Sequence, residues 1–238
     1  MSDIFRAVNQ RGAEEEGPKV DALALDPIKL FPLPAEGQQA ELASVAARLL
    51  DYKPEDRGLV VCFSACTRQE GASFVSYNVA RTLALSLGRR TAWVDANFQN
   101  PQSTLQARES VTLVDCLNDG GKVASLGSGD ALVGVPGGQA LSARRADIAS
   151  NKLEEAIAGF SSRFDFTILD CPPVFNSMET ALMGTVSDGL VLVVEATRLK
   201  HEVVNHALDE LRERRVNVLG TVLNKRRFEL PRFIYNRL

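Results

Sequence analysis

The sequence predicts a doubly wound α/β fold, in which helices cover both faces of a mostly parallel sheet. Two observations carry this prediction. Short apolar runs rich in β-branched residues alternate with segments whose apolar residues recur at the spacing of a helix. The runs are also apolar on both sides of the expected strand, which is typical of strands that are covered on both faces.

The expected strands and helices follow one another along the chain. The strand runs are GLVVCFSA (58–65), TAWVDA (91–96), ALVGV (131–135), FDFTILD (164–170), GLVLVVEA (189–196) and VNVLGTVLN (216–224). A first helix leads into the domain, because four apolar residues fall at positions i, i+3, i+4 and i+7: Leu42, Val45, Ala46 and Leu49. Further helices are expected near 73–87, around Leu153–Phe160 and around Val204–Leu211.

One domain is expected. The 238 residues, 45% hydrophobic and 24% charged, suit a single ordinary α/β domain with a full core. Residues 1–37 are predicted to be a flexible leader, because they hold an EEE run and four prolines with little periodicity. The domain is expected over residues 38–238, ending in a basic, aromatic tail. Residues 98–130, rich in Gly, Ser, Asn and Asp, are expected to be a surface excursion rather than a second domain.

Charge, hydropathy and cysteine spacing narrow the functional classes. The formal net charge of -3 gives no case for general nucleic-acid binding. We expect a cytoplasmic protein, because the start lacks the apolar core of a signal peptide and no run approaches the ~20 apolar residues of a membrane span. The cysteines are scattered without paired spacing, which favours reduced, buried thiols over a metal site or a disulfide framework; they are Cys62, Cys66, Cys116 and Cys171.

The functional residues of such a fold are expected where its strands end. In an open parallel sheet, the ligand crevice lies beyond the carboxyl ends of the strands. The first strand is followed there by SACTRQEGAS (64–73) and the second by Asp95. Asp170 stands in LDCPPV, and Asn224 follows the last strand.

The loop after the first strand carries half of a phosphate-binding signature. The signature G-x-x-x-x-G-K-[ST] supplies backbone amides that cradle phosphates, a lysine for the β and γ oxygens, and a hydroxyl for magnesium. In this chain Cys66 replaces the first glycine and Ala72 replaces the lysine, whereas Gly71 and Ser73 are kept. With the two strand-end aspartates the layout is that of a P-loop nucleotide site, although a chance match or a plain strand-to-helix turn also accounts for the fragment alone.

Five segments resemble a known family over roughly residues 38–238. They are EGAS with NVA (70–73 and 78–80), TAWVDANFQNPQ (91–102), FDFTILDCPPV (164–174), SDGLVLVVEATRLK (187–200) and NVLGTVLNKRR (217–227). Their order and spacing are similar to those of the bacterial tyrosine kinases of capsule and exopolysaccharide systems, relatives of the MinD and ParA deviant-Walker ATPases. The resemblance implies a P-loop NTPase-like fold and, in an active member, an ATP-dependent protein-tyrosine kinase or ATPase.

Several positions depart from the family's pattern. The resemblance implies a D-x-D-x-R motif after the second strand, whose acids position magnesium and activate the attacking hydroxyl. Asp95 is kept, but Asn97 and Gln99 occupy the other positions, and an asparagine cannot accept a proton as a carboxylate does. Phosphoryl transfer depends on positioning and electrostatics, and the loss of one donor costs about 100-fold to 1000-fold in rate. Since Ala72 also removes an ammonium group, we expect no useful turnover.

By resemblance, remnants of the site persist. Asp95 and Asp170 are the remnant catalytic acids, and with Ser73 they are candidate magnesium ligands. The candidate nucleotide-binding residues are Arg68, Glu70, Gly71, Ser73 and, as an adenine-side contact, Asn224. No cofactor is expected to be required, and weak binding of ATP or ADP with magnesium stays an open alternative.

Plainer interpretations stay open for several residues. Ser73 would cap the following helix, Asp170 would be an ordinary strand terminator, and Arg68 would be an exposed loop arginine rather than a substitute for the lysine. His201 and His206 lie five residues apart on a predicted helix, where a solvated surface is favoured over a metal site.

Features that imply assembly in the family are missing here. The family's tyrosine-rich tail is represented by Tyr235 alone, and its oligomerising E-x-x-R-x-x-R helix aligns with Glu41, Ser44 and Ala47. Ring assembly of the family type is therefore in doubt, while other self-association stays open. The tail alternates arginines with apolar residues and would dock on acidic lipid, dock on a partner's cytoplasmic loop, or pack onto its own domain.

Three functional hypotheses follow. The first, implied by the resemblance, is a catalytically degenerate family member in exopolysaccharide biosynthesis. It would be the cytoplasmic partner of a membrane chain-length or export protein, which holds it at the inner membrane. The second is an enzyme with slow ATPase or tyrosine autokinase activity. The third is a positioning module of the MinD or ParA type, against which the absence of their signature lysine at Thr67 counts.

Overall fold

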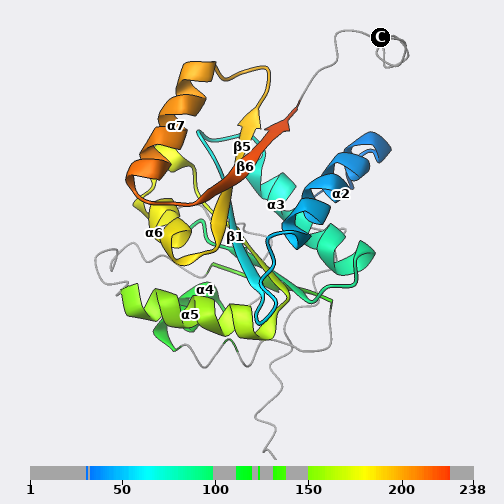
Figure 1. Ribbon diagram of the computed structural model, residues 1–238, viewed down its shortest axis with the longest axis vertical. Coiled ribbons are helices and arrows are strands. Elements are labelled where there is room, and N and C mark those ends of the chain that lie inside the picture. Colours follow the sequence, from blue (N-terminus) through cyan, green and yellow to red (C-terminus); the bar gives the residue numbers. More distant parts are fainter. Residues whose placement is uncertain are drawn as a thin grey trace, which may run out of the picture.

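The computed structural model contains one six-stranded sheet with helices on both faces (Figure 1). It describes residues 31, 33–98, 111–119, 123, 131–137 and 150–225, and every structural statement here refers to them. Most of the predicted leader, position Gln99 and the tail with Tyr235 lie outside the described residues.

The elements alternate between strands and helices as expected. The strands are β1 (Leu59–Ala65), β2 (Thr91–Asp95), β3 (Leu132–Val135), β4 (Phe166–Asp170), β5 (Gly189–Glu195) and β6 (Val218–Asn224). The helices are α2 (Glu36–Leu50), α3 (Ala72–Arg81), α4 (Leu113–Asn118), α5 (Ser150–Arg163), α6 (Met178–Val186) and α7 (His201–Glu213). A π-helical turn (Thr82–Ser86) continues α3, and a 3-10 turn (Val174–Asn176) precedes α6.

The strand order is β3-β2-β4-β1-β5-β6, and all neighbouring pairs are parallel. This confirms the predicted fold class. After β1 the chain moves toward the β3 edge, whereas after β4 it moves toward the β6 edge. The sheet therefore has a switch point between β1 and β4, and the crevice of such a fold lies at the carboxyl ends of these strands.

Two apolar layers form the core, one on each face of the sheet. In β1, Val60 and Cys62 point into the layer that holds α4, α5, α6 and α7, whereas Val61 and Phe63 point into the layer of α2 and α3. All seven residues of β1 are buried, because alternate side chains of a strand point to opposite faces and both faces are covered here.

The structure corrects one expectation about the long connection between β2 and β3. Its described part includes α4, whose Leu113, Cys116 and Leu117 are buried in the core, so this part is not a surface excursion. The Oγ1 of Thr112 accepts from the backbone N of Asp115, and the Asp115 carboxylate accepts from Thr112 in return. This capping box, T-x-x-D, was the signal in the sequence.

Other expectations hold. The first helix begins at Glu36 and buries Leu42, Ala46 and Leu49. The four cysteines are buried free thiols, as predicted. Among the described residues no helix combines the length and the apolarity needed to span a bilayer.

Candidate functional site

The loop between β1 and α3 has a left-handed backbone at two positions. Gln69 has a φ of 69° and Gly71 a φ of 92°, a region in which glycine is the favoured residue. Gly71 is also required by space, because a Cβ there would lie 2.3 Å from the Nδ2 of Asn224. Gly71 is the N-cap of α3 and Ala72 its first residue. Ser73 thus lies inside the first turn, and the interpretation of Ser73 as the helix cap is wrong.

The carboxylate of Glu70 organises this loop. Glu70 is fully buried, and its Oε1 accepts hydrogen bonds from the backbone N (2.6 Å) and the Oγ1 (2.7 Å) of Thr67. Its Oε2 accepts from the backbone N of Glu195 at the end of β5 (3.2 Å). A buried carboxylate needs such donors to replace water. Glu70 therefore closes the loop on itself and ties it to β5.

Arg198, three residues beyond β5, reaches the same loop. Its Nη2 donates to the Oγ1 of Thr67 (3.0 Å) and to the carbonyl oxygen of Arg68 (2.8 Å), and it lies 3.7 Å from the Oε1 of Glu70. Its Nε donates to the Oε2 of Glu195 (3.0 Å). The guanidinium group is thus shared between the loop backbone and two carboxylates.

The end of β6 supplies the second cation. The Nζ of Lys225 donates to the carbonyl oxygen of Gln69 (2.6 Å) and to the Oε2 of Glu195 (3.2 Å). Arg198 and Lys225 therefore face Glu70 and Glu195, two positive charges against two negative ones. We call these four side chains the loop cluster. Its formal charge is zero, so it leaves little net positive field for an additional anion.

Asn224 also holds the loop. Its Nδ2 donates to the carbonyl oxygen of Glu70 (2.8 Å), and its Oδ1 accepts from the backbone N of Lys225 (2.9 Å). Both ends of the amide group are engaged within the protein. A contact from Asn224 to an adenine stays a prediction.

A cavity of about 370 Å³ lies against the loop and the start of α3. The methyl group of Ala72 lines it at the position where the signature has lysine, and Asn97 and Cys171 also line it. Among the described lining residues only Arg68 carries a positive charge, and its side chain is exposed. The exposure fits the plainer interpretation of Arg68.

Two aspartates lie side by side beneath the crevice. Asp95 ends β2 and Asp170 ends β4, the two residues are paired in the sheet register, and both are buried. Burial, the largest cause, raises the pKa of the Asp170 carboxyl to about 7. The hydroxyl of Ser73 lowers this pKa, the charge of Asp95 raises it, and the hydroxyl of Ser76 lowers it.

The hydroxyl groups of Ser73 and Ser76 do not form hydrogen bonds with the carboxylate oxygens of Asp170. Neither of its carboxylate oxygens has a hydrogen-bond partner among the described residues, because the Oγ of Ser76 donates to the Ser73 carbonyl oxygen instead (3.0 Å). Ser73, Asp95 and Asp170 thus lie together, and the two buried oxygens of Asp170 have no donor within the described part of the chain. Burying carboxylate oxygens without hydrogen-bond donors is costly, so this arrangement favours a bound proton or cation.

The thiol of Cys66 in this loop is unreactive at neutral pH. Burial, followed by the charge of Glu70, raises the pKa of Cys66 to about 12. The thiol therefore stays protonated at neutral pH and is a poor nucleophile.

His201 and His206 of α7 do not converge on one point. The ring of His206 stacks on Phe175 with a centroid distance of 5.3 Å, whereas the Nδ1 of His201 is hydrogen-bonded to Asn205. Within the described part of the chain, no three His, Cys, Asp or Glu side chains gather where they could hold a metal ion.

Sequence reasoning missed Arg198, Lys225 and Glu195. A charged residue at or just beyond the ends of β5 and β6 was the available signal, since the ends of all six parallel strands lie at one edge of the sheet. The hydrogen bonds from Arg198 to the carbonyl oxygen of Arg68 and from Lys225 to that of Gln69 join residues 130 and 156 positions apart, and no local pattern contains them.

The comparisons with known proteins agree with this geometry. No protein-family model matches the chain. The tyrosine-protein kinase CpsD of Streptococcus agalactiae is 26% identical over 172 residues, which cover 70% of this chain and 75% of CpsD. In sequence the chain is similar to bacterial tyrosine kinases.

Two further proteins are similar to this chain, one in sequence and one in fold. The succinoglycan biosynthesis transport protein ExoP of Rhizobium meliloti is 27% identical over 177 residues, which cover 70% of this chain and 22% of ExoP. The kinase domain of the Escherichia coli tyrosine kinase ETK matches the fold with a TM-score of 0.66 at 19% identity, over 81% of this chain and 78% of that one.

The resemblance to tyrosine kinases implies ATP and magnesium, and the residues of this chain fit the two unequally. The unpartnered oxygens of Asp170, with Asp95 and the hydroxyl of Ser73, have the donor chemistry of a magnesium site. A triphosphate fits poorly, because Ala72 supplies no cation and the loop cluster is already neutral.

The raised pKa of Asp170 predicts how the stability of this homologue depends on pH. Its pKa is raised from 3.8 to about 7 in the folded state, so the proton stabilises the folded form. This contribution is complete below about pH 4 and is lost as the pH rises toward 7. Asp170→Asn should therefore stabilise the protein, by about 3 kcal/mol more at pH 8 than at pH 5.

Urea unfolding of the natural chain and of Asp170→Asn across this pH range measures the difference. Asp209→Asn is the matched control, because Asp209 is 62% exposed in a surface ion pair and its replacement should give no such trend. An equal effect of Asp170→Asn at pH 5 and pH 8 would contradict the account.

Proposed function

We propose that this chain is a bacterial tyrosine kinase homologue that no longer transfers phosphoryl groups and acts in exopolysaccharide biosynthesis as a binding partner. The observation that carries the proposal is the charge of the crevice. Ala72 stands where the family has its lysine, and the two cations bound to the loop, Arg198 and Lys225, are paired with Glu70 and Glu195.

The physical argument concerns the transition state. A transferring phosphoryl group develops charge on oxygens that positively charged groups must stabilise. Asp95 and Asp170 are buried acids at the ends of neighbouring strands, and Arg68, the one cation among the described lining residues, is an exposed side chain. Asn97 lines the cavity with an amide in place of a carboxylate, so it cannot take the proton of an attacking hydroxyl.

The biological role is inferred from the relatives. ExoP is named a succinoglycan biosynthesis transport protein, and only 22% of it aligns with this chain. We infer that a separate membrane chain-length or export protein supplies the remaining function here, and that this chain works beside it on the cytoplasmic side of the inner membrane. The similarity to kinases such as CpsD supports descent from an enzyme.

Slow ATP turnover is the second candidate function. The assembled Ser73, Asp95 and Asp170 favour it, because two buried acceptor oxygens without donors persist where the family places magnesium. Turnover requires that another group replace the missing ammonium, and Arg68 is the available one.

The first prediction of the proposal concerns this activity. Purified natural chain with ATP and magnesium should release phosphate no faster than Asp170→Ala, within about twofold, and should contain no phosphotyrosine. The reason is the missing positive charge at position 72. Asp170→Asn serves beside Asp170→Ala as the variant of nearly equal shape. Phosphate release by the natural chain more than tenfold above both variants would establish the second candidate instead.

A further prediction separates the role from the chemistry. Deletion of the gene in its native bacterium should lower the amount or chain length of the exported polysaccharide. Complementation with Asp170→Asn should restore the polymer as fully as the natural gene does, since the role requires the fold and not phosphoryl transfer. The measurement is polymer length by size-exclusion chromatography. Failure of Asp170→Asn at normal protein abundance would contradict a non-catalytic role.

A further inference from the structure

An aromatic residue ahead of α2 reaches the cavity beside the loop between β1 and α3. Phe31 lines this cavity of about 370 Å³ together with Ala72. The centroid of its ring lies 6.2 Å from that of Phe74, edge to face at 88°, and 5.4 Å from that of Tyr77, at 47°. Both partners belong to α3, the helix that begins at Ala72. The chain before α2 thus supplies part of the cavity wall, whose other described residues come from the loop, the start of α3 and the strand ends.

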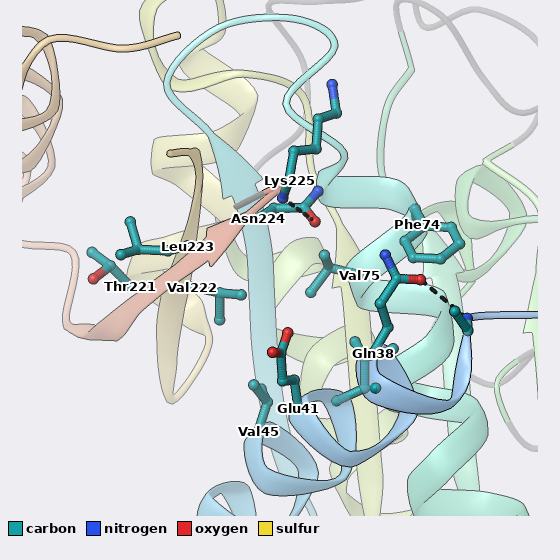
Figure 2. Close-up of a pocket in the computed structure, with 13 residues that line it drawn as sticks. Gln38, Glu41, Val45, Phe74, Val75, Thr221, Val222, Leu223, Asn224 and Lys225 are labelled. Atoms are coloured by element: carbon teal, nitrogen blue, oxygen red, sulfur yellow. Dashed lines mark hydrogen bonds between the residues drawn. The ribbon is translucent and has the colours of Figure 1, made fainter. Parts of the chain in front are cut away.

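The short segment that joins Phe31 to α2 is held at its α2 end. Pro34 is buried, and its carbonyl oxygen accepts a hydrogen bond from the Nε2 of Gln39 (2.9 Å). The backbone N of Ala35 donates to the Oε1 of Gln38 (3.1 Å; Figure 2). The helix α2 itself packs on α3. The segment therefore connects a fixed point at α2 to a ring contact at α3.

The ring contact continues into the core. Tyr77 meets Trp93 edge to face with their centroids 5.6 Å apart, and both side chains are fully buried. The Nε1 of Trp93 donates to the Oγ of Ser76 (3.0 Å), which donates to the carbonyl oxygen of Ser73 (3.0 Å). Phe31 is only half-buried, so it is the member of this aromatic row that can leave without disrupting the core. Contacts of this kind open at a lower free energy than the whole domain unfolds.

We propose that Phe31 controls access to the cavity. While its ring packs on Phe74 and Tyr77, the segment before α2 forms one wall and shields the methyl group of Ala72. When the ring leaves, this wall opens and position 72 becomes accessible. The charge of the crevice decides which anion binds there, whereas Phe31 decides how readily any molecule enters. The proposal therefore does not depend on whether the crevice binds or turns over ATP.

The length of the segment permits this movement. Phe31 precedes the buried Pro34 by three residues, which span about 10 Å when extended. The ring can therefore move well beyond its 5.4 Å contact with Tyr77 while Pro34 and α2 stay in place. A movable wall requires such a tether, because a residue fixed on both sides by buried neighbours could open only with the core.

Thiol labelling of the whole chain tests the proposal. Ala72→Cys places a reporter thiol at a position that is 9% exposed while Phe31 is in place. Adding Phe31→Ala should accelerate the reaction of this thiol with N-ethylmaleimide about tenfold or more, because the segment then loses its ring contacts with α3. Mass spectrometry of the peptide that carries position 72 measures the rate. Phe31→Tyr is the matched control, since it keeps the ring, and its rate should stay within about twofold of that of Ala72→Cys alone.

Two reporters within the chain separate opening of the wall from unfolding of the domain. Cys116 is fully buried in α4, in the core layer on the other face of the sheet, and should stay unlabelled in every variant. Trp93 is the single tryptophan of the chain, so the fluorescence reports the buried end of the aromatic row. Its emission maximum should remain that of a buried indole after Phe31→Ala.

Faster labelling at position 72 with Cys116 still protected supports the proposal. An acceleration by Phe31→Ala of less than about tenfold overturns it, because the ring then shields the cavity too little. An equal acceleration by Phe31→Tyr also overturns it, since the ring would then not be the group that matters. Equal acceleration at position 72 and at Cys116 overturns it as well, because the loss of the ring would then unfold the domain instead of opening one wall.

Discussion

The buried carboxylate of Glu70 is the interaction on which the candidate site depends. It accepts from Thr67 within the loop and from the backbone of β5, so hydrogen bonds within the protein hold the loop after β1. Arg198 and Lys225 then attach to the same loop through its carbonyl oxygens. Both cations also face carboxylates. The contacts that stabilise the loop therefore also leave the loop cluster with no net charge. The exposed ion pairs contribute little by themselves, whereas the buried Glu70 requires its donors.

The proposed loss of catalysis follows from the same balance of charge. The strand ends still assemble Ser73, Asp95 and Asp170 as the family fold dictates. Burial, the largest cause, raises the pKa of the Asp170 carboxyl to about 7. The parallel sheet alone brings these strand ends together, so their proximity by itself is no evidence for turnover. What the family's site would add is a cation inside the crevice.

The sequence predicted the parts of the structure that depend on local pattern. Strands that are apolar on both faces gave the parallel sheet, and the rule for strand ends placed Asp95 beside Asp170. It did not predict α4 or α6, whose starts depend on the short caps at Thr112 and Ser177 rather than on apolar spacing. It also missed Arg198 and Lys225, because their hydrogen bonds to the loop carbonyl oxygens join residues 130 and 156 positions apart and leave no periodic trace in the sequence.

The most direct test of the central claim is the affinity of the natural chain for ATP with magnesium, measured by isothermal titration calorimetry. Ala72→Lys, which restores the ammonium group, and Ala72→Met, which adds similar length without charge, are titrated beside it. The account predicts a dissociation constant above about 1 mM for the natural chain and for Ala72→Met, and binding at least tenfold tighter for Ala72→Lys. Micromolar binding by the natural chain would contradict it.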